Sequence, residues 1–319
     1  MRRFISHDEL ARDSRFIRQD NSLATVLSLL PDDVDQVVEA FERLDPMIAV
    51  SVRGTAAEPL YEEYGPAFGL VVLNEPLEPD APGIETRLVM RMHGIFLGEL
   101  QALEGAGRSL WDFPDAPWEF KMNMARQCWD EARHVQIYEK LLERLEGKIG
   151  MFPESTFLFE CCCHDDPAMR VAGVNRGLEG LACDVFRDMI RYAEKTGDDV
   201  MKQAVDYVLA DELTHVRFGS EWVRAFTAGD PERYERVQDF RRQVDKQFSF
   251  GGSRSDRGDA AIPIARDDRK EAGFTEDELD ELAQLSAGGP SRETMRKAAQ
   301  ILRERHHARR RAASEGAPA

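Results

Sequence analysis

The feature that most constrains this chain is a short motif that occurs twice on helical segments. Residues 130–134 read Asp-Glu-Ala-Arg-His, and residues 211–215 read Asp-Glu-Leu-Thr-His. Each copy places a carboxylate and an imidazole three residues apart, which on an α-helix is one face, about one turn apart. The repeated motif therefore predicts helices that direct acidic and imidazole groups toward the same point.

Each motif is preceded by a Glu at nearly the same distance. Glu99 lies 32 residues before Glu131, and Glu179 lies 33 residues before Glu212. A lone Glu-x-x-His spacing arises easily by chance, but two copies that share a preceding Asp and a partner Glu do not. A third match begins at Glu304 among several arginines, and we interpret it as a solvated tail.

Hydrophobic periodicity predicts an all-α protein with a four-helix bundle at its centre. The four helices are expected at 85–106, 117–146, 167–195 and 198–226. Short loops join the first helix to the second and the third to the fourth, so each pair should form an antiparallel hairpin. The connection at 147–166 is long enough to run the full length of a bundle, which is the long crossover of ferritin-like folds.

Extensions are expected on both sides of a bundle domain that spans residues 85–248. Residues 1–84 read as a mixed elaboration, in which a helical pattern is followed by short extended runs at 47–50 and 69–73. Residues 249–319 read as a polar linker, C-terminal helices and a mobile basic tail. The remaining expected elements are a helix at 231–248, a Gly-rich linker at 251–259, and helices near 275–285 and 291–308.

The chemistry of the motif residues predicts a metal site. The six expected ligands, which would also be the catalytic residues, are Glu99, Glu131, His134, Glu179, Glu212 and His215. Four carboxylates and two neutral imidazoles suit two divalent ions and nearly neutralise their charge. Glu131 and Glu212 are expected to bridge two Fe ions, with Mn or a mixed Mn/Fe pair as alternatives. The competing interpretation is a pair of surface helices with ordinary salt bridges.

Acidic residues next to the ligands have two possible roles. Asp130 and Asp211 each lie four residues before the His of their own motif. Each either accepts the free N–H of the opposite imidazole, and so fixes the ring, or is a surface acid one position off the ligand face. The residues alone leave both roles open.

Several other side chains are weaker candidates. Glu104 is the main rival to Glu99 as a ligand. Cys128 and Cys183 either line the metal cavity or pack in the core, and packing is favoured for both. Tyr138 is either a redox-active neighbour of the site or a core tyrosine, and the core position is favoured. His93 is expected to act beside the ligands or as a structural residue.

Charge and cysteine content bound the partners and the compartment. With 59 acidic and 42 basic residues, the net charge of −17 argues against nucleic acids and anionic membranes as partners. The five cysteines include the run 161–163, and this odd number does not make a disulfide scaffold. Neither a signal peptide nor a membrane span is recognised. A cytoplasmic location is expected.

The segment from His93 to Phe226 resembles a bacterial family of ferritin-like proteins to which no function is assigned. The family is related to rubrerythrins, ferritins and di-iron monooxygenases. The strings that carry the resemblance are residues 98–104, 130–134, 178–180 and 211–219. One departure is Leu97, which stands where the family has a His two residues before the first Glu. The resemblance does not extend to a proton-transfer role for such a histidine.

The resemblance implies a di-iron carboxylate oxygenase or oxidase. Such an enzyme uses O₂ and an external electron donor to hydroxylate, N-oxygenate or desaturate a small organic substrate. The alternatives are iron handling or peroxide scavenging, and a metal-stabilised binding module. Two complete motifs, the lack of paired Cys-x-x-Cys sequences and the long extensions favour the enzyme. A homodimer is compatible with this class.

Overall fold

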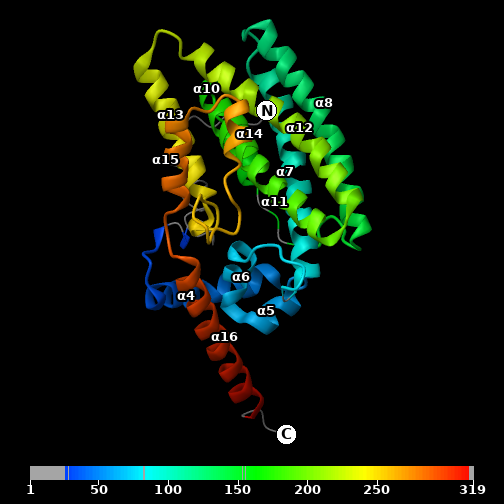
Figure 1. Cartoon of the computed structure of the whole chain (residues 1–319), viewed down its shortest axis with the longest axis vertical. Helices are drawn as coiled ribbons and strands as arrows, with labels where there is room; N and C mark the ends of the chain where they lie inside the picture. Colours follow the sequence, from blue (N-terminus) through cyan, green and yellow to red (C-terminus); the bar gives the residue numbers. More distant parts are fainter. Residues whose placement is uncertain (1–25, 28, 82, 153, 155, 316–319) are drawn as a thin grey trace.

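A computed structural model describes residues 26, 27, 29–81, 83–152, 154 and 156–315, and these residues form an all-α structure (Figure 1). The prediction of an all-α fold is confirmed. In the part of the chain that the structure describes, the only β-type pairing is an isolated bridge between Arg254 and Ile262. No helix in this part is long and apolar enough to cross a membrane.

Four long helical segments form the bundle as two hairpins. Helix α7 packs along α8, helix α11 packs along α12, and α8 and α12 bring the hairpins together (Figure 1). The bounds are α7 (Ile84–Asp112), α8 (Trp118–Arg144), α11 (Glu179–Thr196) and α12 (Asp199–Phe226). All four predicted helices are present, although α7 extends six residues beyond the predicted end at 106.

The tight turn between α11 and α12 follows from two residues. Gly197 ends α11 with φ of 70°, a left-handed conformation that glycine adopts without the steric cost of a Cβ atom. The carboxylate of Asp198 then accepts a hydrogen bond from the backbone N–H of Met201 and caps α12. The chain therefore reverses within two residues, and the Glu179 helix lies beside the second motif.

The third bundle helix contains a π-helical turn. Helix α10 (Pro167–Val171) continues into a π segment (Ala172–Leu178), which leads directly into α11 at Glu179. A Cβ atom on Gly173 would lie 2.6 Å from the ring of Phe240, so this glycine allows α13 (Pro231–Gln247) to pack closely here. π turns are common at functional sites, and this one sets the position of Glu179.

The crossover between the hairpins is held against α7. It contains the short helix α9 (Phe157–Cys161), which packs on α7. The backbone N–H of Gly150 donates to His93 Nε2 at 3.1 Å, and the His93 ring lies edge-on to Phe152. His93 therefore has the structural role that was one of its two predicted uses.

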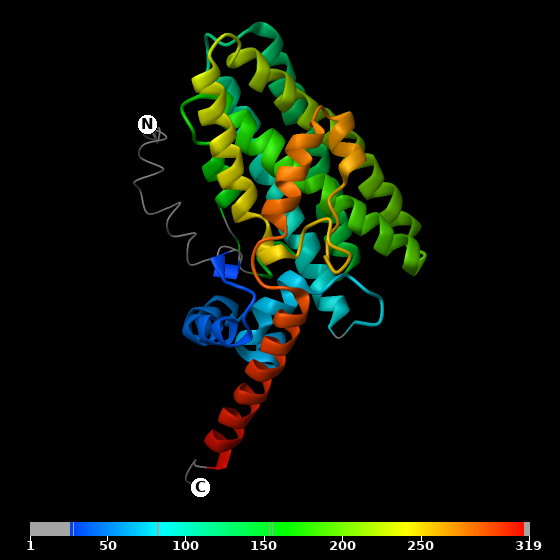
Figure 2. The same ribbon diagram turned by 60° about the vertical axis from the view of Figure 1, so that its left-hand side comes forward.

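The N-terminal extension is helical and packs with the C-terminal helix. Its helices are α4 (Val34–Val52), α5 (Glu58–Tyr64) and α6 (Phe68–Asn74), and α16 (Arg292–Glu315) lies against them (Figure 2). The predicted extended runs at 47–50 and 69–73 are wrong, because both lie in helices. Short apolar runs do not distinguish strands from buried helices, and the contacts with α16 decide the conformation here.

The third Glu-x-x-His match lies on α16 where that helix packs against α5. Glu304 is exposed, as expected of a solvated residue, but His307 Nε2 lies 2.7 Å from the backbone oxygen of Glu63. Its neighbour His306 is buried, and its Nε2 lies 3.1 Å from the backbone oxygen of Glu62 in α5. A Cβ atom on Gly65 would meet the His306 ring at 2.4 Å, so the glycine permits this contact. The helix continues beyond the predicted end at 308 to Glu315, and residues 316–319, which the predicted mobile tail includes, lie outside the described residues.

The predicted Gly-rich linker is partly buried. Residues 251–255 are buried, and they follow α13 and precede the helices α14 (Arg266–Glu271) and α15 (Glu276–Ser286) in the chain; the turn Phe250–Gly252 contacts α15. Arg269 of α14 forms a bidentate ion pair with Asp184 of α11, at 2.8 and 3.0 Å. The predicted polar linker therefore includes a buried part, and Arg254 within it lies 3.6 Å from the same Asp184.

Candidate metal centre

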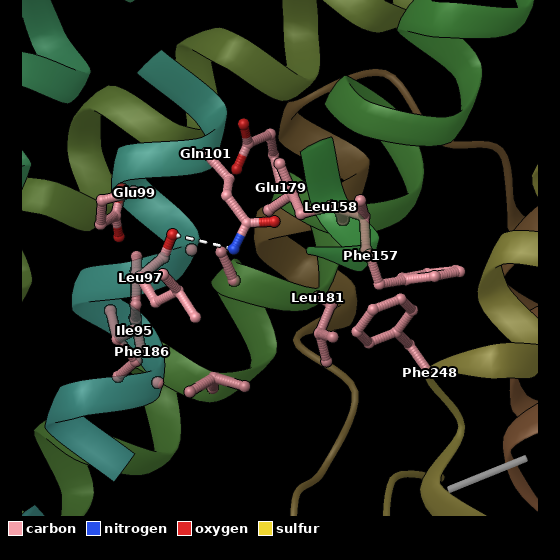
Figure 3. Close-up of a pocket in the computed structure, with 15 residues that line it drawn as sticks. Ile95, Leu97, Glu99, Gln101, Phe157, Leu158, Glu179, Leu181, Phe186 and Phe248 are labelled. Carbon is pink, nitrogen blue, oxygen red and sulfur yellow. Dashed lines mark hydrogen bonds between the residues drawn. The ribbon is translucent and has the colours of Figure 1, made fainter. Parts of the chain in front are cut away.

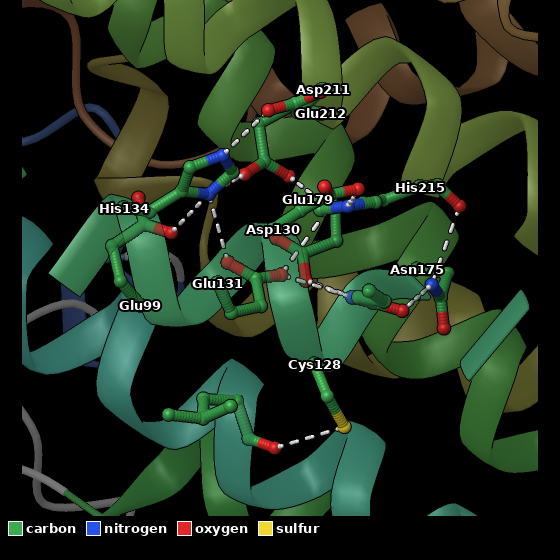
Figure 4. A network of polar contacts seen from close by, with 12 residues as sticks. Glu99, Cys128, Asp130, Glu131, His134, Asn175, Glu179, Asp211, Glu212 and His215 are labelled. Carbon is green, nitrogen blue, oxygen red and sulfur yellow. Dashed lines mark hydrogen bonds and ion pairs between the residues drawn. The ribbon is translucent and has the colours of Figure 1, made fainter. Parts of the chain in front are cut away.

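The six predicted ligand residues meet inside the bundle (Figure 4). They form two groups of four, and the ligand atoms of each group lie within 4.8 Å of one another. The first group is Glu99, Glu131, His134 and Glu212, and the second is Glu131, Glu179, Glu212 and His215. Glu131 and Glu212 belong to both groups, which is the arrangement expected of two bridging carboxylates. Each group adds one His and one further Glu.

The cluster is buried, with one accessible side. Glu131, Glu212 and both histidines are 0% exposed, whereas Glu99 and Glu179 are 5% and 4% exposed. The alternative of salt-bridged surface helices is therefore wrong. Carboxylates in an apolar interior are costly unless cations or protons compensate their charge.

Each imidazole is held by the Asp of the opposite motif. His134 Nε2 lies 3.3 Å from Asp211 Oδ2, and His215 Nε2 lies 3.2 Å from Asp130 Oδ2. The cross-motif role is thus confirmed, and the surface-acid alternative is wrong. Both Nδ1 atoms face the cluster, at 3.0 Å from Glu131 for His134 and 3.1 Å from Glu212 for His215.

This arrangement fits a metal ion at each Nδ1. An ionised Asp only accepts hydrogen bonds, so a neutral imidazole carries its proton on Nε2 and leaves Nδ1 bare. His134 Nδ1 lies 3.0, 3.1 and 3.3 Å from oxygens of Glu131, Glu212 and Glu99, and these oxygens are also acceptors. One N–H cannot satisfy three carboxylates, whereas a cation between them satisfies all four groups.

Without cations, protons take their place. Burial opposes the charged form of His134, but the hydrogen bonds that its ring donates to Glu131, Glu212 and Glu99 outweigh it and raise the pKa of His134. Burial, together with the neighbouring carboxylates, raises the pKa of Glu99 and of Glu179 well above the usual range. The metal-free cluster therefore retains protons that a bound ion must displace.

Two amide side chains that the motif analysis missed support the ligands. Gln127 Nε2 donates to Glu131 at 3.1 Å and to Glu179 at 3.0 Å. Asn175, in the π segment, donates to Gln127 Oε1 at 2.8 Å and so fixes the orientation of that amide. Gln127 lies one helical turn before Glu131, and this spacing was the available signal. Its counterpart in the second half is Val208.

Arg133 is a further residue that sequence reasoning missed. Its guanidinium contacts Asp130 and lies 3.0 Å from Asp211, so one cation holds both of the acids that orient the imidazoles. The same guanidinium lies over the ring of Tyr207, at 5.3 Å from the centroid. The second motif has Thr214 at this position, so a single arginine serves both halves.

Residues 66–280 match the family described as "Protein of unknown function (DUF455)". The chain belongs to this family. The match covers all of the bundle, including the six residues of the cluster, and continues through α13 and α14. No curated protein and no solved structure matches the chain.

The weaker candidates lie outside the cluster. Glu104 is exposed and is not a ligand. Tyr138 and Cys183 are fully buried in the bundle core, and within the described residues the Tyr138 hydroxyl has no hydrogen-bond partner. Burial raises the pKa of Cys128 to about 11, and its Sγ lies 3.9 Å from a carbonyl oxygen. The cysteines at 161–163 are buried and, among the described residues, belong to no metal-binding group.

A cleft of about 300 Å³ leads to the cluster between α7 and α11 (Figure 3). Its walls are mainly apolar, and they include Glu99 and Glu179, the two residues of the cluster that retain some exposure, at 5% and 4%. Leu97 lines the cleft, so an apolar side chain occupies the position where a histidine was expected. The only amide in the wall is that of Gln101, which donates to the Leu97 carbonyl oxygen at 3.3 Å.

Proposed function

We propose that this chain is a ferritin-like di-iron carboxylate enzyme that uses O₂ to oxidise a small organic molecule. The proposal is carried by the two ligand groups that share Glu131 and Glu212, each with one His and one outer Glu. Two helical hairpins joined by a long crossover, with Glu and Glu-x-x-His ligands directed inward, are typical of ferritin-like carboxylate proteins. The same pattern supports two ions rather than one.

Iron is the proposed metal. Carboxylate oxygens with one imidazole nitrogen per ion suit Fe²⁺, and Mn²⁺ or a mixed pair fits the same donors. Bound iron would supply the activation of O₂. In a hydroxylation, one oxygen atom enters a C–H bond of the substrate and the other leaves as water. This balance consumes two protons and two electrons, which an external donor must provide.

The residues of the chain would orient the ligands and exclude water. Asp130 and Asp211 keep the Nε2 proton on each imidazole, so that Nδ1 remains a ligand atom. Gln127 restrains Glu131 and Glu179 from one side of the cluster. The apolar cleft brings a substrate to the side where Glu99 and Glu179 are accessible.

The cleft favours an oxidising enzyme over an iron-handling protein. A cleft of about 300 Å³ lies at the lower end of the range for small-molecule sites, about 300–1,000 Å³. Iron and peroxide as substrates do not require an apolar wall of this size. The proposed partners are thus O₂, a small organic molecule and an electron donor. A net charge of −17 argues against nucleic acids.

The test is anaerobic loading with Fe²⁺ followed by rapid mixing with O₂. We expect two irons per chain and a transient absorption whose decay is accelerated by a substrate. Two irons that simply oxidise and mineralise would instead establish the iron-handling alternative. A protein that binds neither iron nor manganese would refute the metal site itself.

A further inference from the structure

A second cleft adjoins the one that reaches the metal cluster. It has a volume of about 350 Å³ and lies on the other side of a junction formed by Gly94, Ile95 and Val185, which line both clefts. The first cleft contains the two accessible ligand carboxylates. The second contains two arginines, Arg87 and Arg91. A single ligand that crosses the junction would therefore contact the arginines of the second cleft and reach the ligand carboxylates of the first.

Helix α7 forms a continuous floor under the two clefts. Gly94 and Gly98 face open space, since a Cβ atom added at either residue would have no heavy atom within 4 Å apart from the local helix. Arg91 and Glu99 are eight residues apart, which is about 12 Å along a helix axis. The two glycines therefore keep a path open between a cationic end and the metal end.

The cationic end has a charge that the protein does not fully compensate. Arg87 is 5% exposed, and its guanidinium donates to the backbone oxygens of Glu75 and Pro76 at 2.6 and 3.1 Å. Among the residues that the structure describes, its Nε has no hydrogen-bond partner, and the nearby Glu75 carboxylate lies 3.4 Å from Arg292. Carbonyl oxygens solvate a guanidinium but do not neutralise it, so this buried cation would be stabilised by an anion.

The second arginine shares its acid with another residue. Arg91 lies 3.3 Å from Asp188, and the same carboxylate also pairs with Arg191. Around this end, Arg87 and Arg292 share Glu75, and Arg91 and Arg191 share Asp188, so four guanidinium groups face two acids and the charge of this end is net positive. By contrast, among the described residues that line the first cleft, none carries a positive charge.

From this arrangement we propose that the substrate is an amphipathic monocarboxylate, an inference that rests on the function proposed above. Its carboxylate lies at Arg87 and Arg91, and its apolar chain passes Gly94 and Gly98 toward Glu99. A planar guanidinium matches the two oxygens of a carboxylate. The apolar wall between the two ends has no charged partner for a second charged group, which disfavours a substrate with a further charge along its chain.

Calorimetric binding of decanoate and decanol to the zinc-loaded protein tests this ligand class. The two probes have the same alkyl chain and differ in the head group, so the ratio of their dissociation constants isolates the contribution of the carboxylate contact. Decanoate should bind about ten- to a hundredfold more tightly than decanol, which is the range for hydrogen bonds to charged groups. The Arg87→Met variant should lose this preference while its affinity for decanol stays unchanged. Equal binding of both probes to the unaltered protein would refute the proposal.

A second pair of variants tests the path between the clefts. Gly94→Leu should fill the junction and weaken decanoate binding at least tenfold. Gly107→Leu is the matched control, because Gly107 lies farther along α7 and lines neither cleft. If the two variants bind decanoate equally, the path is wrong. Circular dichroism checks that both remain helical.

The outcomes separate this inference from the proposed enzyme. Zinc is redox-inert, so the binding measurements do not depend on O₂ chemistry. Preferential decanoate binding by a protein that yields no oxidised product would refute the enzyme and retain the ligand class. An iron-loaded protein that oxidises a substrate with O₂ but does not prefer decanoate would retain the enzyme and refute the ligand class.

Discussion

Replacing Asp130 with Asn tests whether the acids across the bundle make the imidazoles into metal ligands. Asp130 accepts from His215 Nε2 at 3.2 Å and is almost completely buried. An Asn side chain keeps the shape, but its amide can present N–H to Nε2 and favour the tautomer with its proton on Nδ1. That proton would occupy the position from which His215 binds a metal. The substitution therefore acts on one imidazole and leaves every ligand residue in place.

The magnitude follows from the environment of the two acids. Loss of a partner that orients a ligand typically lowers metal affinity about 10- to 100-fold, or about 1.4 to 2.7 kcal/mol. The Asp130 side chain is 4% exposed, and the Asp211 side chain is 17% exposed. Water can partly replace Asp211, so Asp211→Asn should lie at the lower end of this range and Asp130→Asn at the upper end.

The assay is a competitive Co²⁺ titration, which reports each ion through its visible absorption. We expect Asp130→Asn to weaken one of two ions and to leave the other within about threefold of the unaltered protein. Asp239→Asn is the control, because Asp239 is an exposed acid that pairs with Arg242 away from the cluster. The reasoning would be refuted if both ions weakened equally, or if Asp130→Asn behaved like Asp239→Asn.

Three further predictions concern the same cluster. Gln127→Leu should lower the stability of the metal-free protein by about 1–3 kcal/mol in urea unfolding, because it removes the buried hydrogen bonds of Gln127 to Glu131, Glu179 and Asn175; a change below 0.5 kcal/mol would contradict this role. Metal binding should release protons, because the pKa of His134, Glu99 and Glu179 is raised in the metal-free site. Apparent affinity should therefore fall as pH falls, and calorimetry in buffers of different ionisation enthalpy would detect any failure to release protons. Chelation should lower the thermal midpoint, since each ion at 100 times its Kd contributes about 2.7 kcal/mol; an unchanged midpoint would count against a resident metal.

The bundle and the cluster could be predicted because their signals are local. The 3.6-residue period and the i, i+3 spacing of Glu131 and His134 depend only on helix geometry. The duplication supplied the long-range information, since a second motif with its own upstream Glu implies that two hairpins face each other. Because the motif is duplicated, the pairing of Asp130 with the imidazole of the opposite motif could also be stated, as one of two possible roles.

Other features depend on contacts that the sequence does not encode locally. Asn175 reaches Gln127 because a π turn rotates it toward α8, and helical periodicity gives no sign of that turn. The apolar run at 69–73 became helix rather than strand because α16 covers it from more than 200 residues away. Residues 251–255 read as a linker by composition but are buried, and the turn at 250–252 contacts α15. In each case a tertiary partner overrides the local pattern.

The surroundings make the two halves of the cluster unequal, although the ligands are duplicated. Glu179 is held by the Gln127 amide, while the corresponding position near Glu99 is Val208, which has no donor. Within the described residues, the hydrogen bond of Glu99 is to His134 alone. A restrained carboxylate loses less conformational freedom when it binds a cation than an unrestrained one. The ion between Glu179 and His215 should therefore bind first, and the Glu99 side is the one free to rearrange when a substrate enters the cleft.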